Sequence, residues 1–541
     1  MGKIFKKIIY RYILIFFISL TLILIDTDMA GTAAKIFLLF VLSVTVIEGA
    51  RILAYFPTPS ISHQVVFRPI IHELARRGHE VTVVTTDPVF TKGKTLANLT
   101  EIDVHDISYS KWKDVLLQST GNKDDVLNHI KMIFERMAII LDSQLQIPEV
   151  KNMLKSKDRK YFDLLILEAC SRPLLGITQM FDAPVVTISS FGAVPVQYSA
   201  MGAPMHPLLY PTLGRQKLYN LTLWDKGIEM LKHVAFDIIV STTEAFDYQI
   251  MRKHFGNDVP SYRELGKRIQ MMFLNEHPIW ADNHPVPPSI VYIGGIHKAT
   301  EKELPKDLQN YLDSSKHGVI YVSFGTNVLT SHLPPEKIKI MTKVFSELPY
   351  DVLWKWDKDI LPGQSKNIKI SKWFPQTDVL RHPNVKLFIT QGGLQSTDEA
   401  IDATVPLIGI PMLADQWYNV EKYVFHKIGL QLDMPTLTEK QFKESITTVI
   451  ADKRLKALMR SQPIKPVDKA VWWVEHVIKY GASHLQSPAA HMLWFDYYEI
   501  KLVLITLAII ISILTLLSYI LKLLISFVYK LVKNNIKIKQ Q

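Results

Sequence analysis

The chain has 541 residues, 48% of them apolar and 10% aromatic, a length that predicts two or more domains and a composition that excludes an intrinsically disordered protein. Its formal net charge is +11, but many of the lysines flank apolar runs at the two ends of the chain. We therefore interpret this charge as a membrane-topology pattern rather than a nucleic-acid-binding surface, because no basic stripe interleaved with aromatics lies between the ends.

Two apolar runs open the chain. Ile8–Ile25 is nearly long enough to span a bilayer. Ile36–Ile47 is shorter and precedes small residues, which is typical of a signal peptide with a nearby cleavage site. We therefore expect residues 1–50 to be a hydrophobic extension followed by a signal peptide, with the mature chain beginning near Arg51. The alternative is that both runs are membrane helices.

The first predicted strand is Arg51–Phe56, an apolar run closed by prolines. A helix is expected from His63 to the stop at Gly78, since apolar residues recur in it at helical spacing. Pro69 lies inside this pattern and predicts that the helix starts late or kinks there. Residues 79–86 form a buried strand, so the order strand, helix, strand predicts a parallel α/β sheet.

His63 is the first candidate catalytic residue. In parallel sheets, ligands collect beyond the carboxyl ends of the strands, where a helix start after the first strand falls. A helix amino terminus lowers the pKa of an imidazole and favours the neutral form that accepts a proton. The residues alone leave two interpretations open: a catalytic base, or a histidine that only hydrogen-bonds the loop.

Glu168 ends a second apolar strand, Tyr161–Ala169, and so lies at the same edge of the sheet. A carboxylate there can orient a histidine base and stabilise its charged form. The alternative is a surface glutamate that caps the next turn. Cys170, the single cysteine, permits no intrachain disulfide and is expected to be a buried, unreactive thiol. The long irregular segment Phe191–Leu213 is expected to line an apolar binding cleft.

A proline-rich segment, His284–Ser289, marks the boundary between two halves. We place the first domain at residues 51–283 and the second at residues 284–490. The second half contains the strand Val319–Thr326, whose Ser323 is a small donor suited to approach a phosphate. Further alternation of strands and helices predicts a second parallel α/β sheet.

The turn after the strand Val385–Thr390 consists of Gln391, Gly392 and Gly393, and a helix follows it. Backbone N–H groups and the helix dipole converge at such a turn and favour a bound anion. A Gly-Gly pair alone is a weak pattern, and only its neighbours strengthen it.

Four side chains near this turn complete a predicted nucleotide-sugar site. The face of Trp373 can stack on a base, and Glu399 can bind two ribose hydroxyls. Asp415 and Gln416 can bind sugar hydroxyls. Each has a structural alternative, with Trp373 in the core, Glu399 on a solvated helix face and Asp415 as a helix cap. Because all fall near one sheet edge, together they favour the binding interpretation.

The uncharged run Leu502–Leu521 is as long as a bilayer requires, so we predict a transmembrane helix there. The lysines of residues 522–541 place this tail in the cytosol and the preceding domains in a lumen. The last residues, KIKQQ, are similar to a dilysine retrieval signal of the endoplasmic reticulum, although a basic juxtamembrane tail would also carry lysines. Sequons at Asn98 and Asn220 are expected to be glycosylated in that lumen.

Residues 373–416 carry the pattern W..Q.....HP....F.T.GG.....EA.....P..G.P...DQ. With this pattern the chain resembles the UDP-glycosyltransferases. The resemblance extends to the loop around His63, the strand ending at Glu168, the SFGT strand, the membrane helix and the lysine tail. The variants FPTPSISHQ, TQGGLQSTDEA and SFGTN are most similar to the arthropod branch.

The resemblance implies an α/β fold of GT-B type, with two Rossmann-like domains facing a cleft and a carboxyl-terminal transmembrane helix. The first domain would bind a small lipophilic acceptor and the second a UDP-sugar, with no metal and no other cofactor. The matched residues would then act as follows: His63 as the catalytic base with Glu168 as its partner, Trp373 and Gln376 on uracil, Glu399 on the ribose, Ser323 and the turn Gln391, Gly392 and Gly393 with Gln395 on the diphosphate, and Asp415 and Gln416 on the sugar.

Some positions depart from the pattern of vertebrate members. Gln391 replaces a histidine of the turn, Gln395 replaces an asparagine, and Asn275 falls where an arginine lies near the diphosphate. Glu168 stands where the family usually has an aspartate. The loss of two potential cations weakens the stabilisation of the diphosphate unless backbone amides supply it. We therefore expect UDP-glucose rather than UDP-glucuronate as the donor.

The expected reaction is one inverting displacement that transfers a hexose to the hydroxyl of a small lipophilic acceptor, with His63 as general base. The enzyme is expected in the endoplasmic reticulum membrane, with a single span. Two alternatives remain. One is a non-catalytic, membrane-anchored homologue that binds a UDP-sugar or a lipophile. The other is a transferase for protein or lipid-linked glycans, which the apolar acceptor half disfavours.

Overall fold

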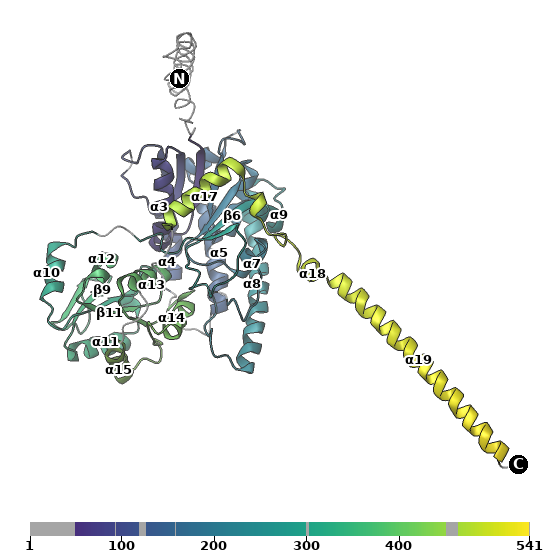
Figure 1. Cartoon of the computed structure of the whole chain (residues 1–541). Coiled ribbons are helices and arrows are strands. Elements are labelled where there is room, and N and C mark those ends of the chain that lie inside the picture. The colour runs from purple at the N-terminus through teal and green to yellow at the C-terminus, as the bar shows by residue number, and fades with distance from the viewer. Residues whose placement is uncertain are drawn as a thin grey trace, which may run out of the picture. The chain divides into compact units, whose positions relative to one another are not determined.

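The computed structural model describes residues 49–539, apart from residues 92, 118–125, 157, 212, 299–301 and 451–463. The two apolar runs predicted before Arg51 lie outside the described residues. From Ala50 onward the chain forms one unit. Figure 1 follows it from the purple strand and helix near Arg51 to the yellow helices near the carboxyl terminus.

The first sheet has seven parallel strands among the described residues, in the order β3-β2-β1-β4-β5-β6-β7. The strand order reverses between β1 and β4, and the carboxyl ends of strands at such a reversal are where α/β proteins bind ligands. The strands are β1 (Arg51–Phe56), β2 (Glu80–Thr85), β3 (Leu99–Asp103), β4 (Leu164–Glu168), β5 (Val185–Ser189), β6 (Ile269–Leu274) and β7 (Ile290–Tyr292).

The second sheet repeats this arrangement with six parallel strands in the described part of the chain, in the order β10-β9-β8-β11-β12-β13. Its order reverses between β8 and β11. Most of its strands are runs of buried apolar residues, as expected for a parallel sheet covered on both faces. The strands are β8 (Val319–Ser323), β9 (Asp351–Lys355), β10 (Ile368–Ser371), β11 (Val385–Thr390), β12 (Leu407–Gly409) and β13 (Gly429–Gln431).

Helices connect the strands of both sheets. Those in the first half are α3 (Ile61–Arg76), α4 (His105–Leu117), α5 (Val126–Gln144), α6 (Pro148–Leu154), η2 (Arg172–Gln179), α7 (Pro195–Ala200), α8 (Leu223–Phe255) and α9 (Tyr262–Gly266). Those that follow are α10 (Lys306–Ser314), η3 (Thr330–His332), α11 (Pro335–Glu347), α12 (Gln376–Arg381), α13 (Leu394–Ala403), α14 (Gln416–Phe425), α15 (Glu439–Ile450), α17 (Pro466–Tyr480), η4 (Ser483–Leu485), α18 (Trp494–Tyr497) and α19 (Ile500–Lys539).

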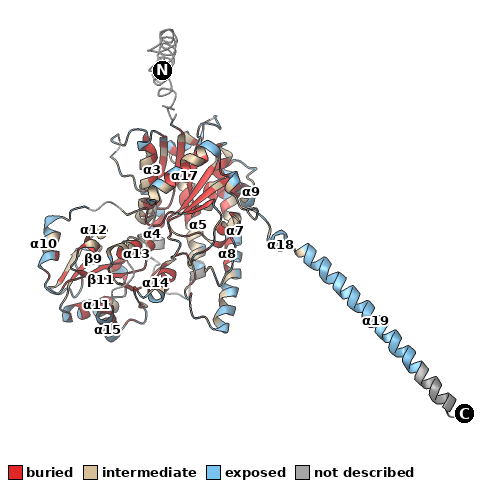
Figure 2. Cartoon of the chain, viewed as in Figure 1, coloured by how far each residue is buried: buried red, intermediate tan, exposed pale blue. Residues whose placement is uncertain are grey.

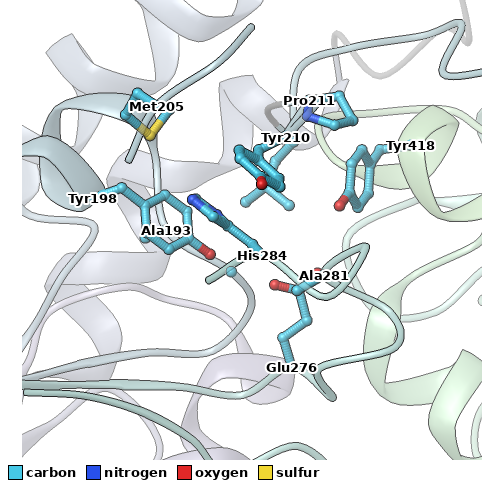
Figure 3. A pocket seen from close by; sticks show the side chains of 11 residues that line it. Ala193, Tyr198, Met205, Tyr210, Pro211, Glu276, Ala281, His284 and Tyr418 are labelled. Atoms are coloured by element: carbon cyan, nitrogen blue, oxygen red, sulfur yellow. The ribbon is translucent and has the colours of Figure 1, made fainter. Parts of the chain in front are cut away.

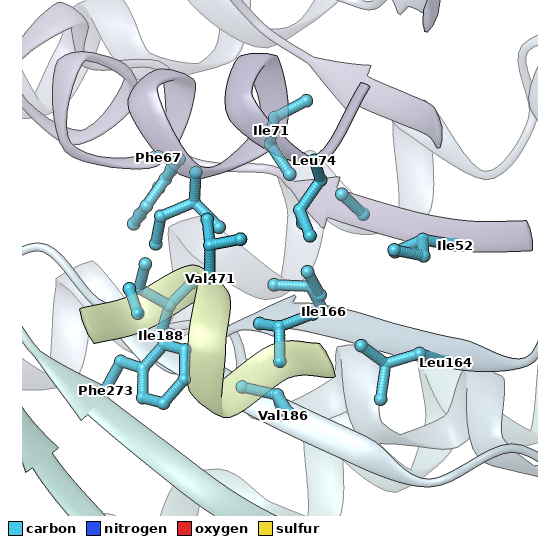
Figure 4. Close-up of a cluster of buried hydrophobic side chains, with 14 of the residues drawn as sticks. Ile52, Phe67, Ile71, Leu74, Leu164, Ile166, Val186, Ile188, Phe273 and Val471 are labelled. Atoms are coloured by element: carbon cyan, nitrogen blue, oxygen red, sulfur yellow. The ribbon is translucent and has the colours of Figure 1, made fainter. Parts of the chain in front are cut away.

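Helix α17 returns from the second half of the chain to the first sheet. Its Val471 is fully buried in one apolar cluster with Phe67 and Ile71 of α3 and with side chains of the strands (Figure 4). Strand β7 also pairs within the first sheet, although it follows residue 284. The first sheet and its core thus include segments from both predicted domains, because the apolar face of α17 is buried there.

The predicted strands are present within a few residues of their expected ends. Helix α3 begins at Ile61 and continues past Pro69 to Arg76, so the predicted late start is wrong. A proline inside a helix costs about 3 kcal/mol. Each buried large apolar side chain on the same helix contributes about 1.5–3 kcal/mol, and α3 buries several, which offsets the proline. The segment Phe191–Leu213, predicted to be irregular, contains the short helix α7.

Helix α19 is long and apolar enough to cross a membrane. Its candidate span, Ile500–Lys530, has a mean hydropathy of 2.8, and its most apolar stretch is not buried against the rest of the chain. Figure 2 shows the helix in pale blue along this span, whereas the central strands of both sheets are mostly red. The span includes the predicted run Leu502–Leu521 and extends beyond both of its ends.

Candidate active site

His63 and Glu168 meet where the order of the first sheet reverses. His63 lies in the first turn of α3, just after β1, and Glu168 is the last residue of β4. Because β1 and β4 are paired in parallel, their carboxyl ends are adjacent, and His63 Nδ1 lies 2.6 Å from Glu168 Oε1. Glu168 is only 2% exposed, so the interpretation as a surface turn cap is wrong.

A backbone contact fixes the Glu168 carboxylate. Its second oxygen, Oε2, accepts a hydrogen bond from the Thr58 N–H at 3.0 Å. With one oxygen held by Thr58, the other accepts from Nδ1–H of His63, which leaves Nε2 as the acceptor nitrogen of the ring. Phe191 holds the ring from the side, edge to face, at 5.6 Å between centroids. Thr58 lies in the FPTPSISHQ segment and Phe191 begins the segment expected to line the cleft, but sequence reasoning gave neither of them a role beside His63.

The sulfur atom of Cys170 lies close to His63 and Glu168. The Sγ atom and the nearest ligand atoms of His63 and Glu168 all lie within 4.8 Å of one another, a spacing that a metal ion could bridge. Here His63 and Glu168 already hydrogen-bond each other. Burial raises the pKa of the Cys170 thiol, and the nearby Glu168 carboxylate adds to this rise, so the sulfur stays protonated. The cluster is therefore better suited to proton transfer than to metal binding.

The glycine turn of the second sheet lies at the reversal between β8 and β11. Gly392 has φ +92°, and a Cβ there would lie 2.3 Å from Val420 Cγ2, so only glycine fits. Gly325 has φ +70°, and a Cβ there would meet the Gln391 amide at 2.2 Å. Ser323 ends β8 beside them and is 1% exposed. The two loops can pack this closely only because they lack side chains at these positions.

Trp373 follows β10 and is 61% exposed, so the interpretation as a core residue is wrong. The Lys355 ammonium lies over its ring, 4.8 Å from the centroid. The same ammonium donates to Gly325 O at 2.7 Å, and burial lowers its pKa to about 8. Lys355 therefore brings a cation to the loop of Ser323, and no pattern in the sequence had singled it out.

Glu399 points from α13 toward α12 rather than into solvent. It accepts a hydrogen bond from Gln376 Nε2 at 2.7 Å and another from Thr377 Oγ1 at 2.8 Å. Gln376 Oε1 accepts in turn from the Tyr321 hydroxyl at 3.2 Å. Burial raises the pKa of Glu399. The interpretation as a solvated helix face is wrong, and the structure brings Gln376 and Glu399 into direct contact.

Asp415 and Gln416 lie at the start of α14. Asp415 occupies the N-cap position of α14, as the cap interpretation expected, but its side chain makes no cap hydrogen bond, and its carboxylate accepts from Asn419 Nδ2 at 2.9 Å. Burial raises its pKa. Gln416 is buried, and its Oε1 accepts from the N–H groups of Met412 and Leu413, both at 2.8 Å. The Gln416 oxygen therefore shapes the loop before α14.

Two side chains of the second half of the chain, on α13 and in the loop after β8, contact the loops around His63. Gln395 Nε2 donates to Ser190 O at 2.8 Å, and Asn327 Nδ2 donates to Ser60 Oγ at 3.0 Å. Asn275 is fully buried, and its amide also donates to Ser190 O, at 3.1 Å. The amides of Asn275 and Gln395 are thus engaged with the loop after β5.

Comparison with known proteins places these residues in a family. A family model described as "UDP-glucoronosyl and UDP-glucosyl transferase" matches residues 52–538. The chain belongs to this family. It is a UDP-glycosyltransferase of the arthropod type, as the resemblance of its motifs predicted.

Two relatives indicate its branch within the UDP-glycosyltransferases. It is 35% identical over 483 residues to an ecdysteroid UDP-glucosyltransferase of Spodoptera littoralis nuclear polyhedrosis virus, covering 84% of this chain and 93% of the relative. It is 32% identical over 479 residues to UDP-glucosyltransferase 2 of Dactylopius coccus, covering 85% of this chain and 90% of the relative.

The fold agrees with the family. The solved structure of a calicheamicin glycosyltransferase is similar, with a TM-score of 0.52 at 16% identity, over 81% of this chain and 100% of the other. The predicted GT-B type of fold, with two parallel α/β sheets and a carboxyl-terminal apolar helix, is therefore confirmed.

Asp398, next to Glu399 on α13, is a buried carboxyl whose effect on the stability of the protein can be measured. It is 5% exposed, and its Oδ2 has no hydrogen-bond partner among the described residues. Burial raises its pKa from 3.8 to about 7. The unfolded chain therefore releases this proton near pH 4 and the folded one near pH 7, so the carboxyl lowers stability as pH rises between these values.

Asp398→Asn should remove this effect, because asparagine is nearly isosteric with the neutral acid. Relative to wild type, we expect the variant to gain up to about 1.4 kcal/mol of unfolding free energy per pH unit through this window. Urea unfolding of the full chain in detergent at pH 4.5, 6 and 7.5 measures the gain. A difference between the two proteins that does not change with pH would contradict the assignment.

Proposed function

We propose that this UDP-glycosyltransferase transfers glucose from UDP-glucose to a hydroxyl of a small lipophilic acceptor, with inversion at the anomeric carbon. The observation that carries the proposal is the 2.6 Å hydrogen bond between His63 and the buried Glu168. A neutral imidazole held in this way is suited to act as a general base. The names of the relatives, which are UDP-glucosyltransferases of a virus and an insect, support the choice of glucose.

In the proposed reaction, His63 Nε2 removes the proton of the acceptor hydroxyl as its oxygen attacks the anomeric carbon. The bond from that carbon to the β-phosphate oxygen breaks, and UDP leaves with both bonding electrons. Glu168 stabilises the imidazolium that forms. One such displacement inverts the configuration, and a positioned base contributes about 10²–10⁴-fold to its rate.

The donor is assigned to the second sheet. Trp373 and Gln376 would bind uracil and Glu399 the ribose, and a bound ribose would compete with the present contacts of Glu399 to Gln376 and Thr377. The remaining donor contacts are those that the family resemblance implies: the diphosphate on Ser323, Gln391, Gly392, Gly393 and Gln395, and the sugar on Asp415 and Gln416. The reaction as proposed needs the UDP-sugar and the acceptor and no metal or other cofactor.

The choice of glucose over glucuronate rests on charge. Gln391 is neutral, and the amide of Asn275 donates to Ser190 O, so neither offers a cation to a carboxylate of the sugar. The cation of Lys355 is bound to Gly325 O and covers Trp373. An uncharged hexose therefore suits the described residues better than a uronate.

The proposed location is the endoplasmic reticulum membrane, with α19 as a single span, the catalytic domains in the lumen and the lysine-rich tail in the cytosol. The apolar helix supports this location, and so do the two sequons, since Asn98 and Asn220 are both exposed to solvent. Detoxification of lipophiles would be one use of such an enzyme.

Transfer itself is tested with microsomes that contain the full chain. We expect glucose to be transferred from radiolabelled UDP-glucose to simple phenols and to an ecdysteroid, and transfer from UDP-glucuronate to be at least ~10-fold slower, since a buried unpaired charge costs more than 1 kcal/mol. The anomer of the product is determined by NMR. A protein that binds UDP-glucose but transfers nothing would instead be the non-catalytic homologue, and faster transfer from UDP-glucuronate would overturn the choice of glucose.

A further inference from the structure

A small cavity is lined in part by the loop after β5, whose Phe191 contacts the His63 ring. Its volume is about 20 Å³, room for one water-sized group. It lies among the loop after β5, the segment after β6 and helix α14. Figure 3 shows its principal side chains, which are Tyr198, Met205, Tyr210, Glu276, His284 and Tyr418.

Glu276 lacks a partner in this cavity. It is 2% exposed, and its Oε1 has no hydrogen-bond partner among the described residues. The carboxyl points into the space between His284 and Tyr418 (Figure 3). Gly192 makes room for it, because a Cβ at that position would lie 2.6 Å from Oε2. Buried polar groups are rarely left unpaired, so a ligand group or a water is expected beside Oε1.

The neighbouring polar groups have partners already. His284 Nε2 donates to Pro204 O at 2.7 Å, and the ring stacks on Tyr210 with centroids 4.3 Å apart. The Tyr418 hydroxyl donates to Trp280 O at 3.4 Å. The His284 ring and the Tyr418 hydroxyl are therefore engaged, whereas Glu276 Oε1 is open to a ligand group.

The charges around the cavity favour a neutral ligand group. Burial raises the pKa of Glu276 to about 8, and the nearby Asp282 adds to the rise while Lys422 opposes it. The Lys422 ammonium is bound to Asp282 at 2.7 Å and lies 4.2 Å from the centre of the Tyr418 ring. A cationic ligand would be repelled by Lys422, whereas a hydroxyl can both donate to and accept from a neutral carboxyl.

The cavity adjoins the proposed acceptor site. Phe191 contacts the His63 ring, and Gly192, the next residue, lines the cavity. An acceptor whose reacting hydroxyl lies at His63 Nε2 can thus extend past Phe191 toward Glu276. The other lining residues of the loop after β5 are mostly apolar or aromatic, and the cavity has room for the hydroxyl group only, not for the body of the acceptor.

We infer that the cavity at Glu276 is a subsite for a second hydroxyl of the acceptor, remote from the one that is glycosylated. The inference rests on the proposed function and names the acceptors that the site selects, which are lipophiles with two separated hydroxyl groups. An acceptor without the second hydroxyl leaves the buried carboxyl of Glu276 unpaired. Such an acceptor binds more weakly, by the free energy of the missing hydrogen bond.

A matched pair of acceptors tests this selection: 4-phenylphenol, and 4,4′-dihydroxybiphenyl with a second hydroxyl at the far end. We expect the wild-type full chain to prefer the diol by about 10- to 100-fold in kcat/KM, after correction for its two equivalent hydroxyls. Glu276→Gln retains a donor and an acceptor and should keep the preference. Glu276→Leu should lose it, because leucine has the size but no polar atom.

The ratio of the two acceptors is measured within each variant, so a general loss of activity does not affect it. Should Glu276→Leu fail to fold, Gly192→Ala provides the same test, since its Cβ displaces the carboxyl and should also abolish the preference. Equal use of both phenols by wild type would overturn the inference and leave a buried water as the occupant. A preference that survives in Glu276→Leu and in Gly192→Ala would overturn it too.

Binding of both phenols is measured in parallel by isothermal titration calorimetry in the presence of UDP. If wild type transfers no glucose but binds the diol more tightly by a similar factor, the proposed function is wrong and the subsite stands. If it glycosylates both phenols and binds them equally, the proposed function stands and the subsite is wrong. Preferential binding of 4′-aminomethyl-4-hydroxybiphenyl, a cationic analogue, would contradict the requirement for a neutral group.

Discussion

His63→Ala should reduce kcat for glucose transfer by about 10²–10⁴-fold, the contribution of a positioned general base. Binding of UDP should not change, because the donor residues lie on the second sheet. The alanine leaves a small space beside Glu168, whose carboxylate keeps its hydrogen bond from the Thr58 N–H and so has a partner in the variant. Initial rates with UDP-glucose and a phenol, together with calorimetric titration of UDP, measure both quantities.

A matched control for this variant lies on the same helix. His72 is a half-buried histidine of α3 whose ring lies 5.4 Å from that of Phe90. His72→Ala should leave kcat within about threefold of wild type, since it removes a similar side chain without touching the site. If His63→Ala were as active as this control, His63 would not be the base.

Glu168→Gln should lower kcat/KM by roughly 10³–10⁴-fold although it changes no volume, the size of effect known for the wrong histidine tautomer in a catalytic triad. The Thr58 N–H requires an acceptor, so the glutamine oxygen will take the place of Oε2. The amide NH₂ then faces His63 Nδ1 and donates to it. The ring is forced to carry its proton on Nε2, where it cannot accept one from the acceptor hydroxyl.

The double variant His63→Ala, Glu168→Gln separates this explanation from a structural one. If Glu168 acts only through the ring of His63, the double variant will be no slower than His63→Ala alone. Glu168→Asp should recover part of the rate, because it restores a carboxylate one methylene shorter. A further large loss in the double variant would show that Glu168 acts by another route.

Local patterns were sufficient where the structure depends on residues close in sequence. The Gly-Gly turn, the strand Val385–Thr390 and the helix after it are contiguous, and the structure contains them nearly as predicted. Local patterns did not decide whether a candidate side chain is buried in the core or exposed at the site. Trp373 is apolar and was equally compatible with the core, but the loop after β10 leaves it 61% exposed, over Lys355. Exposure depends on what packs above a residue, which periodicity does not encode.

Contacts between segments far apart in the chain could not be predicted from the sequence. His63 and Glu168 are 105 positions apart, and their distance is set by the parallel register of β1 with β4. Asn275 was expected near the diphosphate from its position in the pattern. In the structure its buried amide donates to Ser190 O, which also accepts from Gln395, a contact between distant segments that the pattern did not specify. The helix α17 packs on the first sheet although it follows the second, because its apolar stripe is buried there.

The sequence by itself determined the class of protein: two parallel sheets, a membrane-length apolar helix and the motif of the UDP-glycosyltransferase family. Such features follow from short-range periodicity, turn residues and motif spacing, which each segment carries on its own. Only the tertiary structure decided that Glu168 is buried against His63 and that Oε1 of Glu276 has no hydrogen-bond partner among the described residues. Burial and hydrogen-bond satisfaction are properties of groups brought together from separate segments, and they exist only once the strands have taken their order in the sheet.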